Sequence, residues 1–175
     1  MSGPLRVSAA AMMAAALVAC GWQLRGSGQT ELAQQPLRLE SKAGDSDLLG
    51  LTRQALRRIG ARVADDDEAV PVLVLLSDAI RRRTIATDDD GRASAWELEY
   101  QLRFALNPAP SASDDEAAAP EQPLIRSRRV TASDTYQASP LATQAEQAQR
   151  RRLTEELRDE AVRLMLSQVA SALDD

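Results

Sequence analysis

The stretch WELEYQLRFAL, residues 96–106, decides the fold of this chain. Apolar and aromatic side chains occupy every even position from 96 to 106, whereas the odd positions from 97 to 103 carry a charge or an amide. Successive side chains of a β-strand point to opposite faces of a sheet. The stretch therefore predicts a strand with one face on a core and the other in solvent or against a partner.

The residues before this strand predict its hairpin partner. Val70–Leu76 is rich in β-branched residues and leucine, and the strand pattern continues through Ile80 and Ile85. The dipeptide Asp90-Gly91 then stands between the two strand patterns, where it is a strong hairpin signal. We therefore expect two long antiparallel strands joined at this turn.

The same turn partly matches a calcium-binding loop. The match consists of four ligand-type or turn positions, Asp88, Asp90, Gly91 and Glu97. Ala86 would occupy the first ligand position and offers no carboxylate, and strands rather than helices flank the segment. The hairpin is the favoured interpretation.

Periodicity and capping residues predict the remaining elements on both sides of the hairpin. These are a strand at Leu37–Glu40, a helix from about Asp45 to Ile59, a strand at Leu124–Tyr136 and a helix from about Leu141 to Leu173. Gly60 stands where a helix cap belongs, and residues 107–122 lack periodicity and predict a mobile loop. The simplest arrangement is an α+β two-layer sandwich, with two helices on one face of a mixed four-stranded sheet.

The N-terminus predicts a lipoprotein signal peptide over residues 1–19. Arg6 supplies a basic start, Val7–Val18 form an apolar segment, and Leu17-Val18-Ala19-Cys20 has the pattern of a lipobox. Cys20 would then carry an S-diacylglycerol and an N-acyl chain, each buried methylene adding about 0.8 kcal/mol to membrane binding. The alternatives are an ordinary cleavable signal with an unpaired thiol, or a buried helix.

A lipidated Cys20 also predicts the compartment and the domain plan. An aspartate directly after the lipidated cysteine commonly retains lipoproteins at the inner membrane, and this chain has Gly21 there. The sequence therefore favours the outer membrane, with the protein anchored in the inner leaflet and facing the periplasm. Residues 20–35 would form a polar tether, and residues 36–175 a single domain. Because the chain has one cysteine, no disulfide can form within it.

Composition weighs against an enzyme and against nucleic acid as a partner. The chain has no histidine, and with Cys20 lipidated the usual general base, thiol nucleophile and zinc ligands are missing. Arg6 is the one charged residue before Cys20, which leaves 20 basic against 26 acidic residues and a formal charge of −6. We expect no catalytic site, no metal and no cofactor beyond the covalent lipid.

Arginine clusters are the candidate binding residues. The triplet Arg81–Arg83 lies in the predicted hairpin, Arg92 follows its turn, and Arg126, Arg128 and Arg129 lie in the last strand. Alternation places Arg81 and Arg83 on one face and Arg82 on the other. If the hairpin pairs with the last strand, several guanidinium groups would collect near one end of the sheet and bind anions. A solvated strand edge protected by charge is the alternative, and both interpretations stay open.

The heptapeptide CGWQLRG, residues 20–26, is similar to the start of the LptE family of outer-membrane lipoproteins. The resemblance extends through Ser46–Gly60, through the Asp90-Gly91 hairpin and Glu97–Tyr100, and to Glu156–Leu166. It implies a domain that plugs the LptD β-barrel, supports the assembly of that barrel, binds lipopolysaccharide and takes part in its transport to the outer leaflet.

The same resemblance implies that basic residues near the hairpin and the sheet end bind lipopolysaccharide. Arg92 is the nearest candidate, with Arg81, Arg83 and Arg128 as further candidates. The basic position that relatives carry ahead of the final helix has no counterpart in Thr143–Glu146. Two other functions stay open: a periplasm-facing adaptor lipoprotein of another outer-membrane assembly complex, and a carboxylate-dependent hydrolase, for which no convincing acid/base pair is visible.

Overall fold

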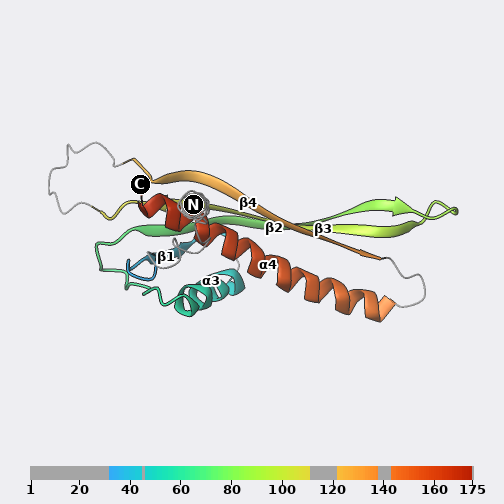
Figure 1. Ribbon diagram of the computed structural model, residues 1–175, viewed down its shortest axis with the longest axis horizontal. Coiled ribbons are helices and arrows are strands. Elements are labelled where there is room, and N and C mark those ends of the chain that lie inside the picture. Colours follow the sequence, from blue (N-terminus) through green and yellow to red (C-terminus); the bar gives the residue numbers. More distant parts are fainter. Residues whose placement is uncertain (1–31, 45, 111–121, 138–142, 175) are drawn as a thin grey trace, which may run out of the picture.

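The computed structural model describes residues 32–44, 46–110, 122–137 and 143–174. Within these residues the chain forms four strands and two helices (Figure 1). In chain order they are β1 (Arg38–Ser41), α3 (Ser46–Arg58), β2 (Val72–Thr87), β3 (Ala93–Asn107), β4 (Ile125–Gln137) and α4 (Thr143–Asp174). The predicted signal peptide, Cys20, most of the predicted tether and residues 111–121 of the predicted loop lie outside the described residues.

The strands form one mixed sheet in the order β1-β2-β3-β4. β1 runs parallel to β2, and α3 connects them, whereas β2, β3 and β4 are antiparallel neighbours. β1 pairs only with Val72–Leu75, at the start of β2. The rest of β2 continues with β3 into a long hairpin, whose tip extends past the first residues of α4 (Figure 1).

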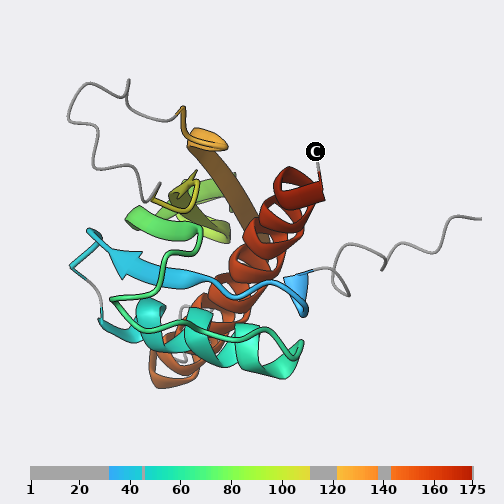
Figure 2. The same cartoon turned by 90° about the vertical axis from the view of Figure 1, so that its left-hand side faces the viewer.

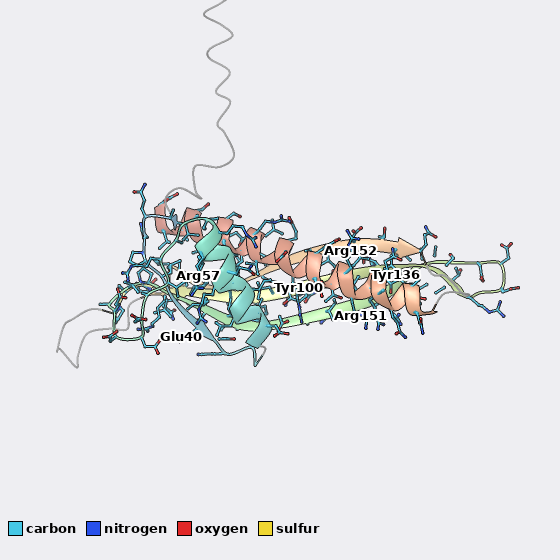
Figure 3. All side chains as sticks on the ribbon, turned by 90° about the horizontal axis from the view of Figure 1, so that it is seen from below. Glu40, Arg57, Tyr100, Tyr136, Arg151 and Arg152 are labelled. Carbon is cyan, nitrogen blue, oxygen red and sulfur yellow. The ribbon has the colours of Figure 1, made fainter. Side chains whose placement is uncertain are left out.

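Both helices lie on the same face of the sheet. Figure 2 shows α3 and α4 on one side of the strands, and Figure 3, seen from below, shows both helices in front of the sheet. The predicted α+β two-layer arrangement is therefore confirmed.

Alternation along β3 builds the core between these two layers. Leu98, Tyr100, Leu102, Phe104 and Leu106 are all buried, as the even-numbered pattern predicted. They pack against a stripe of α4 that repeats at helical spacing: Leu157, Ala161, Met165 and Val169. Fully burying one leucine or phenylalanine side chain contributes about 1.5–3 kcal/mol, so this stripe supplies much of the stability.

The end of α3 follows the predicted cap. Gly60 has a φ of +84°, in the left-handed region that glycine adopts without strain. The amide of Gly60 donates to the carbonyl of Arg57 at 3.1 Å, and the amide of Ala61 donates to that of Leu56 at 3.0 Å. These are the two hydrogen bonds of a Schellman motif, and they turn the chain back toward the sheet.

Two further features bear on the sequence predictions. Leu32, in the segment predicted as a tether, is 1% exposed and belongs to the core. Among the described residues, no helix combines the length and apolar character needed to cross a membrane.

Candidate functional site

The sheet face opposite α3 and α4 is the candidate site, and we call it the open face. Register assigns its residues, because paired residues of neighbouring strands share a face and the odd positions of β3 point away from the core. Along the stretch from Glu97 to Arg103 of β3, the residues of the open face are Ser77, Ala79, Arg81 and Arg83 of β2, Glu97, Glu99, Gln101 and Arg103 of β3, and Arg129, Thr131, Ser133 and Thr135 of β4. All but Ala79 are polar or charged.

Near the hairpin, the arginines of the open face stand opposite carboxylates. Arg81 pairs in register with Glu99, and Arg83 with Glu97. The guanidinium of Arg83 also forms an ion pair with the carboxylate of Glu97. This hydrogen bond holds the pKa of Glu97 below its usual value, since it stabilises the ionised carboxylate. Two of the predicted binding residues, Arg81 and Arg83, thus share one face as expected. Each stands opposite a glutamate of β3, and we call these two opposite-charge rows the charge ladder.

Arg82 takes the other face, as alternation predicted. Its guanidinium carbon lies 4.1 Å from the centre of the Trp96 ring, within the range of a cation–π interaction. Further along the same face, the hydroxyl of Tyr100 donates to the carboxylate of Asp78 at 2.8 Å. Arg82 therefore covers an aromatic side chain on the helix face and does not join the arginines of the open face.

The hairpin turn holds Arg92 at the protruding tip. The carboxylate of Asp88 accepts from the amides of Asp90 at 3.1 Å and Arg92 at 2.8 Å, and Gly91 has a φ of +76°. The guanidinium of Arg92 contacts the carboxylate of Asp90 at 2.8 Å, and both side chains are largely exposed. The turn is a hairpin as predicted, and Arg92 stands in solvent with one carboxylate beside it.

The arginines of β4 lie at the opposite end of the sheet from Arg92. Arg129 pairs with Arg103, and Arg128 pairs with Phe104, about 20 Å along the strands from the row of Glu97 at a rise of about 3.4 Å per residue. Arg128 also lies on the opposite face from Arg81 and Arg83. The expectation that the guanidinium groups collect near one end of the sheet is therefore wrong, because register separates those of the hairpin from those of β4.

Sequence reasoning missed Arg103. Its guanidinium donates to the hydroxyl of Ser127 at 3.2 Å, and it stands directly opposite Arg129 on the open face. Beyond this row, the same face continues with three buried apolar residues, Val72, Val74 and Ala105. The odd position of Arg103 in the alternating strand gave its face, but only the register reveals its partner.

The acidic loop after α3 has a structural explanation. The guanidinium of Arg62 donates to both carboxylate oxygens of Glu68, at 2.7 and 2.6 Å. This fork, together with the amide of Asp65, lowers the pKa of Glu68 to about 2. Within the described residues, no group of three histidine, cysteine, aspartate or glutamate side chains is placed to hold a metal ion.

Comparison with known proteins agrees with the fold and with the sequence resemblance. A protein of Photorhabdus laumondii named LPS-assembly lipoprotein LptE is 28% identical over 151 residues, which cover 86% of this chain and 76% of the relative. The LptE of Pectobacterium atrosepticum is 27% identical over 149 residues, 84% of this chain and 74% of the relative. The predicted resemblance to the LptE family is confirmed. No protein-family model matches the chain.

Solved structures of lipoproteins share this LptE-like fold. The crystal structure of rare lipoprotein B from Shewanella oneidensis has a TM-score of 0.64 and 25% identity, covering 78% of this chain and 94% of that protein. The solution structure of an uncharacterized lipoprotein B from Nitrosomonas europaea has a TM-score of 0.63 at 20% identity, covering 88% and 93%. The second likeness is one of fold alone.

Proposed function

We propose that this chain is a non-enzymatic outer-membrane lipoprotein of lipopolysaccharide assembly. In this proposal it plugs the LptD β-barrel, supports the assembly of that barrel and binds lipopolysaccharide on its way to the outer leaflet. The observation that carries the proposal is the similarity to two LptE lipoproteins over 84–86% of the chain.

The polarity of the open face supports a plug inside a barrel. The lumen of a large membrane β-barrel is polar, so a domain that fills it needs a charged surface with satisfied partners. The charge ladder that Arg83 and Glu97 form on the open face fits this requirement. Both helices pack on the other face, where they bury the apolar side of the sheet.

The protruding hairpin supports contact with a ligand. Arg92 lies at its tip, largely exposed, and a guanidinium group can bond two oxygens of one phosphate. Phosphate groups of lipid A would be bound through such contacts, and this binding would weaken as salt screens the charges. Arg81 and Arg83 lie on the same hairpin, opposite Glu99 and Glu97. They would add to the positive electrostatic potential of the hairpin to the extent that these two carboxylates do not neutralise them.

A lipid on Cys20 would hold the domain at the inner leaflet of the outer membrane, on its periplasmic side. Three acyl chains bind a membrane essentially permanently, at about 0.8 kcal/mol for each buried methylene. With that cysteine acylated and no histidine in the sequence, binding and scaffolding are the functions that the composition favours.

Co-purification tests the proposal. A tag at the C-terminus allows the full-length lipoprotein to be extracted from outer membranes in mild detergent, with the Cys20→Ala variant as the control for lipidation. We expect a large β-barrel in stoichiometric amount together with lipopolysaccharide. Recovery of the lipoprotein alone would contradict the proposal, and recovery of other envelope proteins without lipopolysaccharide would favour the adaptor hypothesis.

The contribution of the hairpin can be measured in the same preparation. We expect Arg92→Glu to lower the lipopolysaccharide recovered per barrel, while Arg57→Glu, an equal charge change on exposed α3, leaves it unchanged. Equal losses for both variants would show that net charge, not the hairpin, determines binding.

A further inference from the structure

An unusual pair of like charges lies at the base of the open face. Arg103 of β3 and Arg129 of β4 are directly opposite each other, and both side chains are exposed. Residues opposite each other in an antiparallel pair have Cβ atoms about 5 Å apart, and like charges there are destabilising. The row therefore carries a local repulsion.

The rest of the open face does not share this repulsion. Nearer the hairpin, Arg81 and Arg83 stand opposite Glu99 and Glu97. Among the described residues, no ion pair joins a carboxylate to either Arg103 or Arg129. Two positive charges thus face each other across this row, whereas Arg81 and Arg83 each stand opposite a glutamate and Arg83 forms an ion pair with its own.

The donors of this row suit an anion. The guanidinium of Arg103 is held by its hydrogen bond to the hydroxyl of Ser127, which uses one of its five N–H groups. The hydroxyl proton of Ser127 is left to donate elsewhere, because the oxygen is the acceptor in that bond. Ser77 of β2 stands opposite Arg103 on its other side and adds a second hydroxyl. Two guanidinium groups flanked by hydroxyls can surround a tetrahedral oxyanion.

We propose that Arg103 and Arg129, with Ser127 and Ser77 beside them, form an anion-binding subsite that takes a phosphate group. A phosphate would neutralise the like charges and accept bidentate hydrogen bonds from planar guanidinium groups. The subsite lies at the opposite end of the sheet from Arg92. The proposal rests on the geometry of this row and does not depend on the proposed transport function.

Phosphate titration of the purified, lipidated full-length protein in nonionic detergent tests the subsite. The readout is the change in backbone amide NMR signals of residues 101–105 and 127–131. The probes are inorganic phosphate, glucosamine 1-phosphate and micelles of a phosphorylated glycolipid. The test variant is Arg103→Gln/Arg129→Gln, and the matched control is Arg57→Gln/Arg58→Gln, which removes the same charge from exposed positions in the last turn of α3.

We expect the Arg103→Gln/Arg129→Gln variant to bind phosphate at least about tenfold more weakly than the wild type, since charge-assisted hydrogen bonds are lost. The control should change by less than about twofold, because its arginines lie on α3 and not on the open face. Equal weakening in both variants would overturn the subsite and indicate diffuse charge. Unchanged binding in the first variant would overturn it as well.

The probes also separate the sources of phosphate. Saturable binding of inorganic phosphate and glucosamine 1-phosphate, lost in the test variant, supports a subsite open to soluble ligands. Binding of the glycolipid alone, lost in the same variant, supports a subsite for a lipid headgroup. If no probe binds and the variant instead loses a co-purifying protein, the row is a protein contact and the proposal is wrong. Failure of barrel co-purification would leave all these outcomes unaffected.

Discussion

The two faces of β3 have opposite roles although their residues alternate along a single strand. Leu102 is fully buried beneath the helices, while its neighbours Gln101 and Arg103 stand on the open face. One face contributes stability through apolar burial, and the other presents polar groups to whatever lies outside. The difference shows that residues available for function are those that the core does not need.

The open face itself divides into two regions. At the hairpin end, Arg83 is paired with Glu97, whereas at the base Arg103 stands opposite Arg129. Charge matching makes the first region a satisfied surface, and like charge makes the second a site that an anion would stabilise. The number of arginines alone therefore does not locate a binding site, because the residues opposite each arginine determine whether its charge is already neutralised.

The largest expected effect is a loss of stability that distinguishes the core face of β3 from its open face. Leu102→Ala should destabilise the protein by about 2–5 kcal/mol, because it removes apolar contacts and leaves a cavity in the core. Gln101→Ala, one residue away on the open face, should change stability by less than about 0.5 kcal/mol. Urea unfolding followed by circular dichroism measures both. Similar losses for the two variants would show that the open face is not solvent-facing.

A charge reversal at the base of the open face should have a smaller effect of opposite sign. Arg129→Glu replaces a like-charge pair with an opposite-charge pair next to Arg103 and should stabilise the protein by about 1 kcal/mol at low salt. Arg129→Gln should give a smaller gain. Unfolding in urea at two salt concentrations tests this, and loss of stability in the reversed variant would argue against repulsion in this row.

The cation–π contact on the helix face of β2 should contribute less. Arg82→Ala should cost about 0.5–1 kcal/mol, since it exposes the ring of Trp96 and removes the contact at 4.1 Å. Arg81→Ala, its neighbour on the open face, serves as the control. Thermal unfolding monitored by tryptophan fluorescence should separate the two variants; identical curves would mean that the contact contributes no measurable stability.

The smallest expected effect is a pH dependence from Glu97. Because Arg83 lowers the pKa of Glu97 in the folded state, the ionised carboxylate stabilises the fold at pH values above its unfolded pKa of about 4.3. That contribution is lost as the pH falls through the lowered, folded-state pKa. Glu97→Gln should therefore be less stable than the wild type at pH 7, and the difference should disappear once the pH falls below the lowered pKa of the folded state. A difference independent of pH would point to a cause other than this carboxylate.

Local sequence patterns predicted most of the fold. Alternation in residues 96–106 identified the core-facing side chains, Gly60 marked the end of α3, and Asp90-Gly91 marked the hairpin turn. Each of these features depends on residues that are close in sequence. Strand alternation, a glycine in the left-handed region and turn-forming residues all act over a few residues, so a single sequence was enough to predict these elements.

The candidate site was predicted less well, because it depends on register. Alternation placed Arg81 and Arg83 on one face, but it could not tell that Arg103 pairs with Arg129. Irregularities near Leu76 and after Phe104 shift the pairing, and a shift of one residue moves every side chain to the other face. Contacts between strands more than twenty residues apart in sequence carry no local signal.

Photo-crosslinking in living cells tests the central claim most directly. A photoreactive amino acid placed at Thr131, exposed on the open face, is compared with one at Gln54, exposed on α3. If the protein is the lipopolysaccharide-binding plug of a barrel, Thr131 should form adducts with lipopolysaccharide or with a large β-barrel, and Gln54 should form none with lipopolysaccharide. Absence of both adducts at Thr131, or equal lipopolysaccharide adducts at the two positions, would contradict the account.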